Sequence, residues 1–143
     1  MSQPLSRPHI LKWGGGAATI VIAGAVLPNF GLSAALAEDM VPVLGEGDIG
    51  VLNYAYALEQ LEAAFYTQVI KTPYKDMPDE EKAYLSDIMD HEVAHREFLK
   101  KALADKAIPD LEVDFSAVDF TSRKSVLTTA MTFEDLGVSA YNG

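Results

Sequence analysis

Apolar residues recur at steps of three and four positions in three stretches of the chain, which is the spacing of one face of an α-helix. The stretches cover residues 48–70, 78–104 and 121–143. Prolines stand between the first and second stretches and again after the second. This pattern predicts an all-α fold, an antiparallel helix bundle.

Residues 105–121 break the helical pattern. They contain Pro109, four aspartates and two similar short runs that end at Phe115 and Phe120. We expect an extended connection that the two phenylalanines hold against the bundle. It would form a long crossover between the second and third helices.

Residues 1–37 have the pattern of an export signal. They carry Arg7 and Lys12 but no acid, then an apolar stretch shorter than the roughly 18–20 residues of a membrane span, then small residues at 35–37 suited to cleavage. We therefore expect a mature helical domain at 38–143, exported to a periplasmic or extracellular location.

The segment 6–12 is similar to a twin-arginine export motif in which Pro8 replaces the second arginine. Twin-arginine export carries folded proteins, often with a metal already bound. The alternatives are an ordinary signal and an uncleaved leader, and only the latter would attach the protein to a membrane.

Composition narrows the functional classes. The 143 residues include no cysteine, which excludes a disulfide scaffold, an iron–sulfur cluster and a thiolate zinc site. After residue 37 there are nine basic and 21 acidic residues, so binding to DNA or RNA is not expected. Any metal must be bound by carboxylates and histidines.

Each predicted helix carries charged residues within its apolar rows. In the second helix, Glu92 and His95 interrupt an apolar row that consists of Leu85, Ile88, Leu99 and Ala102. His91 lies next to Glu92 on the same helical face. The corresponding residues of the other helices are Glu59, Glu62 and Glu134.

Burying a carboxylate costs several kcal/mol unless it is paired, protonated or bound to a metal. A Glu on one helix with Glu-x-x-His on the next is half of a di-metal carboxylate site in a four-helix bundle. Such a set, here Glu92 and His95 with the glutamates of the other helices, suits iron, and manganese second. A buried polar network without metal is the alternative.

These segments resemble a known family. The runs 48–66, 91–99 and 133–143 are similar to helices of the ferritin-like proteins that include the desiccation-related proteins. The resemblance implies a ferritin-like bundle, commonly exported, with iron binding or stress protection as its function.

For individual residues, the resemblance implies Glu59 or Glu62 as the first-helix ligand, with Glu59 the better fit. It further implies Glu92 as a bridge between two metals, His95 as a terminal ligand and Glu134 as the third-helix ligand.

Three of the family's four helices are present in the sequence. Because three helices leave an apolar groove open, we expect a homo-oligomer or another partner to cover it. In a two-fold dimer, the Glu-x-x-His sets of two copies could complete a symmetric site.

Two other functions remain open. Residues 91–95 spell His-Glu-x-x-His, the pattern of zinc metallopeptidases, although no histidine follows to act as a third ligand. Alternatively, the protein is a structural or protective helical protein in which the inward glutamates accept hydrogen bonds and no metal is bound.

Overall fold

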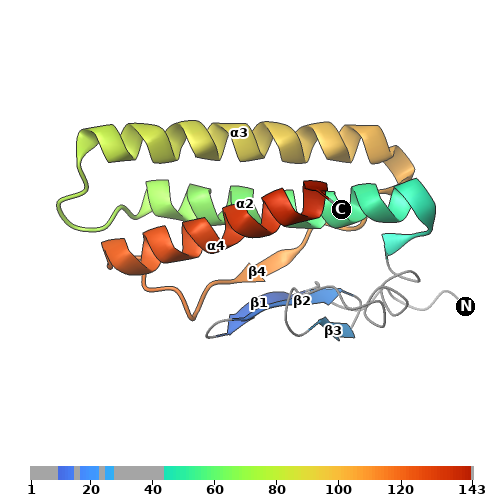
Figure 1. The fold of residues 1–143 in the computed structure, drawn as a ribbon, viewed down its shortest axis with the longest axis horizontal. Coiled ribbons are helices and arrows are strands. Elements are labelled where there is room, and N and C mark those ends of the chain that lie inside the picture. The colour runs from blue at the N-terminus through green and yellow to red at the C-terminus, as the bar shows by residue number, and fades with distance from the viewer. Residues whose placement is uncertain (1–9, 15–16, 23–24, 28–43, 143) are drawn as a thin grey trace, which may run out of the picture.

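The structure, a computed structural model, describes residues 10–14, 17–22, 25–27 and 44–142. It confirms the helix bundle, which consists of α2 (Gly47–Lys71), α3 (Asp79–Leu103) and α4 (Arg123–Asn142) (Figure 1). None of the described helices is both long and apolar enough to cross a lipid bilayer.

Helix α2 forms the centre of the bundle. Its middle and C-terminal turns are buried on nearly all sides, because α3 packs on one face while α4 and the crossover pack on others. The segment 72–78 turns the chain sharply, so that α3 runs antiparallel to α2 (Figure 1). Glu59 and Glu62, in the middle of α2, are therefore kept from water.

The long crossover returns the chain along the whole length of the bundle and is confirmed. It begins with a short 3-10 turn, η1 (Ala104–Lys106), and ends at α4, which runs antiparallel to α2 (Figure 1). The first turns of α3 and α4 consequently lie together, and Arg123 Nη2 lies 2.6 Å from Glu81 Oε2.

The two phenylalanines of the crossover pack on α2, as the sequence predicts. The ring centroids of Phe115 and Phe120 each lie 5.8 Å from that of Phe65. Phe133 of α4 meets the same ring edge to face, with centroids 5.2 Å apart. Phe65 therefore connects α2 with α4 and with the crossover. Burying such a ring stabilises the folded protein by roughly 1.5–3 kcal/mol.

Buried polar side chains of α2 fix the crossover, a role that sequence analysis did not identify. Asn53 Nδ2 donates hydrogen bonds of 2.8 Å to the carbonyls of Leu44 and Lys106, and its Oδ1 accepts one from Ile108 N at 2.9 Å. Gln60 Oε1 accepts a bond of 2.7 Å from Leu111 N.

A small sheet includes a strand of the crossover (Figure 1). Its order is β3-β2-β1-β4, from β1 (Ile10–Gly14), β2 (Ala17–Ile22), β3 (Ala25–Leu27) and β4 (Glu112–Asp114). Strands β1 and β4 pair in parallel, and the other pairs are antiparallel.

The sheet differs from the sequence-based expectation in two ways. The crossover contains a strand where only an extended connection was expected, and the segment predicted as an export leader supplies its partner. Export itself stays a prediction, and the expected cleavage position at 35–37 lies outside the described residues.

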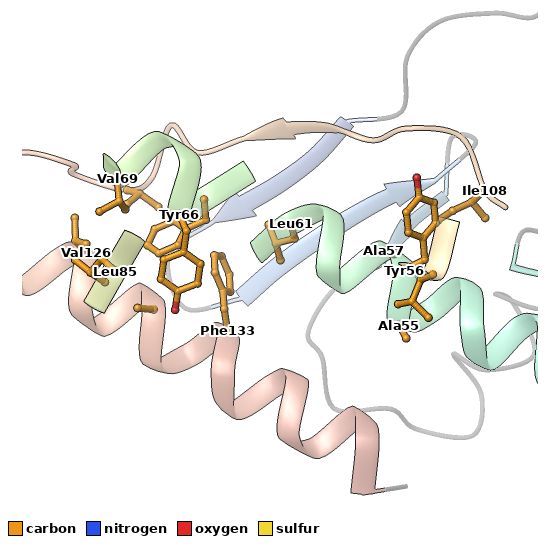
Figure 2. Close-up of a cluster of buried hydrophobic side chains, with 14 of the residues drawn as sticks. Ala55, Tyr56, Ala57, Leu61, Tyr66, Val69, Leu85, Ile108, Val126 and Phe133 are labelled. Atoms are coloured by element: carbon orange, nitrogen blue, oxygen red, sulfur yellow. The ribbon is translucent and has the colours of Figure 1, made fainter. Parts of the chain in front are cut away.

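The core is one cluster of buried side chains that extends along α2 (Figure 2). Tyr66, Val69, Leu85, Val126 and Phe133 gather near the C-terminal end of α2. Ala55, Tyr56, Ala57 and Ile108 lie near its N-terminal half, and Leu61 lies between the two groups.

Some predicted core positions are wrong. The apolar spacing of the first and third stretches includes Val51 and Val138 and predicts both as core positions, but Val51 of α2 is 66% exposed and Val138 of α4 is 60% exposed. Ala102 is also exposed, and Leu103 is buried in its place. Apolar spacing fixes which residues share a face, but the neighbouring helices decide which part of that face is covered.

Candidate metal centre

Three buried carboxylates meet between α2 and α3. Glu59 and Glu62 lie one turn apart on α2, and Glu92 faces them from α3. Their exposed fractions are 2%, 5% and 6%, and one carboxylate oxygen from each lies within 4.8 Å of the others. The structure therefore brings together three of the glutamates that the sequence analysis selected.

His95 lies at the edge of this carboxylate cluster. Its Nδ1 is 3.3 Å from Glu92 Oε2 and 3.5 Å from Glu59 Oε2. The side chain is 44% exposed, whereas the sequence pattern placed it in the middle of the core face. The histidine thus lies between the buried carboxylates and solvent.

Helices α2 and α4 exchange two tyrosine–glutamate hydrogen bonds. The Tyr66 hydroxyl of α2 donates to Glu134 Oε1 at 2.6 Å, and the Tyr141 hydroxyl of α4 donates to Glu59 Oε1 at 2.8 Å. On each helix the tyrosine follows the glutamate by seven residues, or two turns. Because the two helices run antiparallel, the glutamate of each helix lies opposite the tyrosine of the other, and one alignment of the helices forms both hydrogen bonds.

Glu134 is placed beside the cluster rather than within it. It is partly buried, bonded to Tyr66, and close enough to raise the pKa values of both Glu62 and Glu92. Its role as the third-helix ligand, which the family resemblance implies, stays a prediction.

The electrostatics of the cluster favour proton uptake when no metal is bound. Burial, and then the charges of Glu59, Glu92 and Glu134, raise the pKa of Glu62 to about 9. Burial and the neighbouring Glu59 and Glu134 raise the pKa of Glu92 to about 8. A bound cation would reverse this preference, since it stabilises the deprotonated carboxylates.

The two tyrosine hydroxyls also hold their protons strongly. Burial, followed by the hydrogen bond to the acceptor carboxylate, raises the pKa of Tyr66 and of Tyr141 above the ordinary value for tyrosine. Each hydroxyl therefore acts as a fixed donor near neutral pH.

His91 lies outside the carboxylate cluster. Its side chain is 70% exposed and its Nδ1 is 4.0 Å from Glu92 Oε1. The zinc-peptidase alternative requires Glu92 to activate water beside two histidines. Glu92 instead points into the buried cluster, so the geometry disfavours a peptidase.

Sequence analysis missed a glycine that makes room for the cluster. A Cβ on Gly137 of α4 would stand 3.3 Å from Glu62 Oε1. The signal was available, because Gly137 shares the helical row of Glu134.

The donor set fits a hard or borderline metal ion. Glu59 Oε2 is buried without a hydrogen-bond partner among the described residues, and its nearest ion-pair contact is His95 Nδ1. Carboxylate oxygens with one imidazole are ligands that suit iron and manganese. A buried carboxylate oxygen without a hydrogen-bond partner, beside carboxylates whose pKa values are raised, therefore fits a cation as its partner.

The crossover, the antiparallel helices and the inward glutamates define the class of this protein as a ferritin-like helical protein. The family model for the ferritin-like domain matches residues 47–143. The chain belongs to this ferritin-like domain family. No curated protein and no solved structure matches it.

Helices α3 and α4 carry exposed apolar side chains. Large apolar side chains there are more than half exposed in the described chain: Tyr84, Phe98, Met131, Val138 and Tyr141. That a second copy or another partner covers them stays a prediction.

Proposed function

We propose that this protein is an exported ferritin-like protein that binds iron between α2, α3 and α4. The observation that carries the proposal is the buried group of Glu59, Glu62 and Glu92, whose oxygens lie within 4.8 Å of one another with His95 at its edge. Among the described residues, no lysine or arginine forms an ion pair with these three carboxylates.

In this proposal Glu59, Glu62, Glu92 and His95 hold the metal, and Glu134 supports the site from α4. Bound iron would supply redox chemistry, while the chain supplies position and shielding. Tyr141 orients Glu59 through the hydrogen bond to its Oε1, leaving Oε2 directed toward His95. The negative surface attracts cations and raises their local concentration.

The test is iron loading of the metal-free full-length protein under anaerobic conditions, followed by metal analysis. We expect wild type to retain iron after desalting. Glu62→Gln should lose more than about tenfold in affinity, since even loss of an outer partner of a ligand costs about 10- to 100-fold. Glu97→Gln is the matched control, because Glu97 is an exposed carboxylate on α3.

Equal iron retention by wild type and Glu62→Gln would overturn the iron proposal. It would then favour the second candidate, a protective helical protein without metal. The two tyrosine–glutamate bonds support that candidate, because they give Glu59 and Glu134 partners from within the chain.

Export is part of the same proposal and has a separate test. Mass analysis of the protein recovered outside the cytoplasm should give a chain that begins at Glu38, which follows the predicted cleavage position. A full chain that starts at Met1 and remains inside the cell would refute export, whatever the metal content.

A further inference from the structure

Helix α3 lies along an edge of the molecule and carries a row of exposed side chains (Figure 1). Tyr84, His91 and Phe98 follow one another at intervals of seven residues, so they share one face of the helix. Tyr84 is 62% exposed and Phe98 is 70% exposed, and the His91 side chain is 70% exposed. The buried residues of α3 that follow them directly point elsewhere: Leu85, Glu92 and Leu99.

This outer row, which also includes Ile88 and Ala94, is self-complementary about His91. Tyr84 and Phe98 lie seven residues on either side of His91, and Ile88 and Ala94 lie three residues on either side. If a second copy of α3 packs antiparallel with the two His91 residues opposite each other, Tyr84 meets Phe98 of the second copy. The larger Ile88 then meets the smaller Ala94, and such pairs let two helices interdigitate.

The charges at the two ends of α3 also favour an antiparallel second copy. The first turn contains Asp79, Glu80 and Glu81, and the last turn contains Lys100 and Lys101. In the antiparallel arrangement, the acidic turn of each copy lies beside the basic turn of the other. A parallel arrangement would bring like charges together. Such complementarity contributes little affinity at an exposed rim, but it selects the direction of pairing.

The exposed aromatic rings supply part of the area that a stable dimer needs. More than half of Tyr84 and of Phe98 is exposed. Since an aromatic side chain buries about 150–250 Å² in full, the four rings of a dimer would bury roughly 500 Å². A specific interface buries about 1,200–2,000 Å² in total. The remaining area would come from Ile88, His91, Ala94 and the charged turns at the two ends.

We propose that the outer row is the contact surface of a homodimer, in which α3 of one copy packs antiparallel on α3 of the other. The two-fold axis passes beside His91, and the same residues of both copies form the interface. Glu92 faces the buried carboxylates of α2, so the dimer contact and the carboxylate cluster use different sides of α3.

Analytical ultracentrifugation of the metal-free full-length protein over a dilution series tests this proposal. We expect wild type to form dimers that dissociate on dilution. Phe98→Asp should raise the dissociation constant by more than about 30-fold, because each dimer loses two aromatic anchors. Val51→Asp is the matched control, since Val51 is a 66% exposed apolar residue on α2 and its replacement should leave dimerisation as in wild type.

Exchanging charges tests the direction of pairing. Glu80→Lys should weaken the dimer several-fold at low ionic strength, because it places a lysine beside the basic turn of the second copy. Adding Lys101→Glu in the same chain should restore the dimer, since opposite charges again face each other. Circular dichroism checks that each variant is folded.

A wild-type protein that stays monomeric at every concentration would overturn the proposal, and the outer row would then await a different partner. Dimerisation that Phe98→Asp leaves unchanged would also overturn it, because the copies would then meet on another face. Failure of the double variant to recover would refute the antiparallel pairing of α3. Because these measurements use metal-free protein, their outcome is independent of the iron proposal.

Discussion

Gly137 on α4 and Glu62 on α2 face each other so closely that a methyl group at 137 would stand 3.3 Å from Glu62 Oε1. The absent side chain lets α4 cover the carboxylate without displacing it. A close contact between backbone and a charged group thus helps to shape the candidate centre.

Gly137→Ala should therefore weaken iron binding several-fold while changing stability little. Alanine improves helix propensity by about 1 kcal/mol, which offsets the crowding of Glu62. Iron titration and thermal unfolding check the two expectations. Ser139→Ala, an exposed change on the same helix, should leave iron binding as in wild type. Iron affinity unchanged in Gly137→Ala would show that Glu62 does not need this space.

The pKa of Glu62 predicts how the stability of the metal-free protein depends on pH. The pKa is about 9 in the folded protein and 4.5 unfolded, so between these values the folded state binds more protons. Stability is therefore greatest at low pH within this window and falls as pH rises through it. We expect metal-free protein to be less stable at pH 8 than at pH 5.

Glu62→Gln isolates this effect. The amide cannot ionise, so at pH 8 the variant should be more stable than wild type by about 4 kcal/mol and unfold at a higher temperature, whereas at pH 5 the two proteins should differ little. Thermal unfolding in the presence of a chelator measures both. If the stability of the two proteins depended on pH in the same way, Glu62 would not have a raised pKa in the folded protein.

The two tyrosine–glutamate bonds should differ in strength. Tyr66 is 1% exposed, whereas Tyr141 is 65% exposed, so water can replace the second bond more easily. Tyr66→Phe should destabilise by about 1.5–3 kcal/mol, and Tyr141→Phe by less than about 1 kcal/mol. Urea unfolding of the matched pair provides the comparison. Equal losses would mean that burial does not set the strength of these bonds.

Asn53 should be among the most sensitive polar positions for folding. Asn53→Ala leaves two carbonyls and the Ile108 amide without their partner. The expected loss of stability is about 2–4 kcal/mol, measured by urea unfolding. Gln68→Ala, on the same helix but hydrogen bonded at the surface, is the control and should cost under about 1 kcal/mol. A loss for Asn53→Ala no larger than for this control would show that the crossover is held by other contacts.

Local periodicity was sufficient to predict much of the fold. The three helices, their approximate bounds and the long crossover follow from apolar spacing, prolines and short connections, because these act within a few turns of one helix. The same spacing placed Glu59, Glu62 and Glu92 on buried faces. It placed Val138 wrongly, because exposure depends on how far a neighbouring helix extends.

The sequence by itself determined the helices and the kind of ligands available, since residue types and helical spacing are local properties. Only the tertiary structure decided which ligands meet. Antiparallel packing of α2 against α3 gathers Glu59, Glu62 and Glu92, and the crossover brings α4 alongside so that Tyr66 reaches Glu134. It also divided the adjacent histidines, leaving His91 in solvent and His95 at the cluster edge, because helical rotation relative to neighbours is set by packing across the bundle.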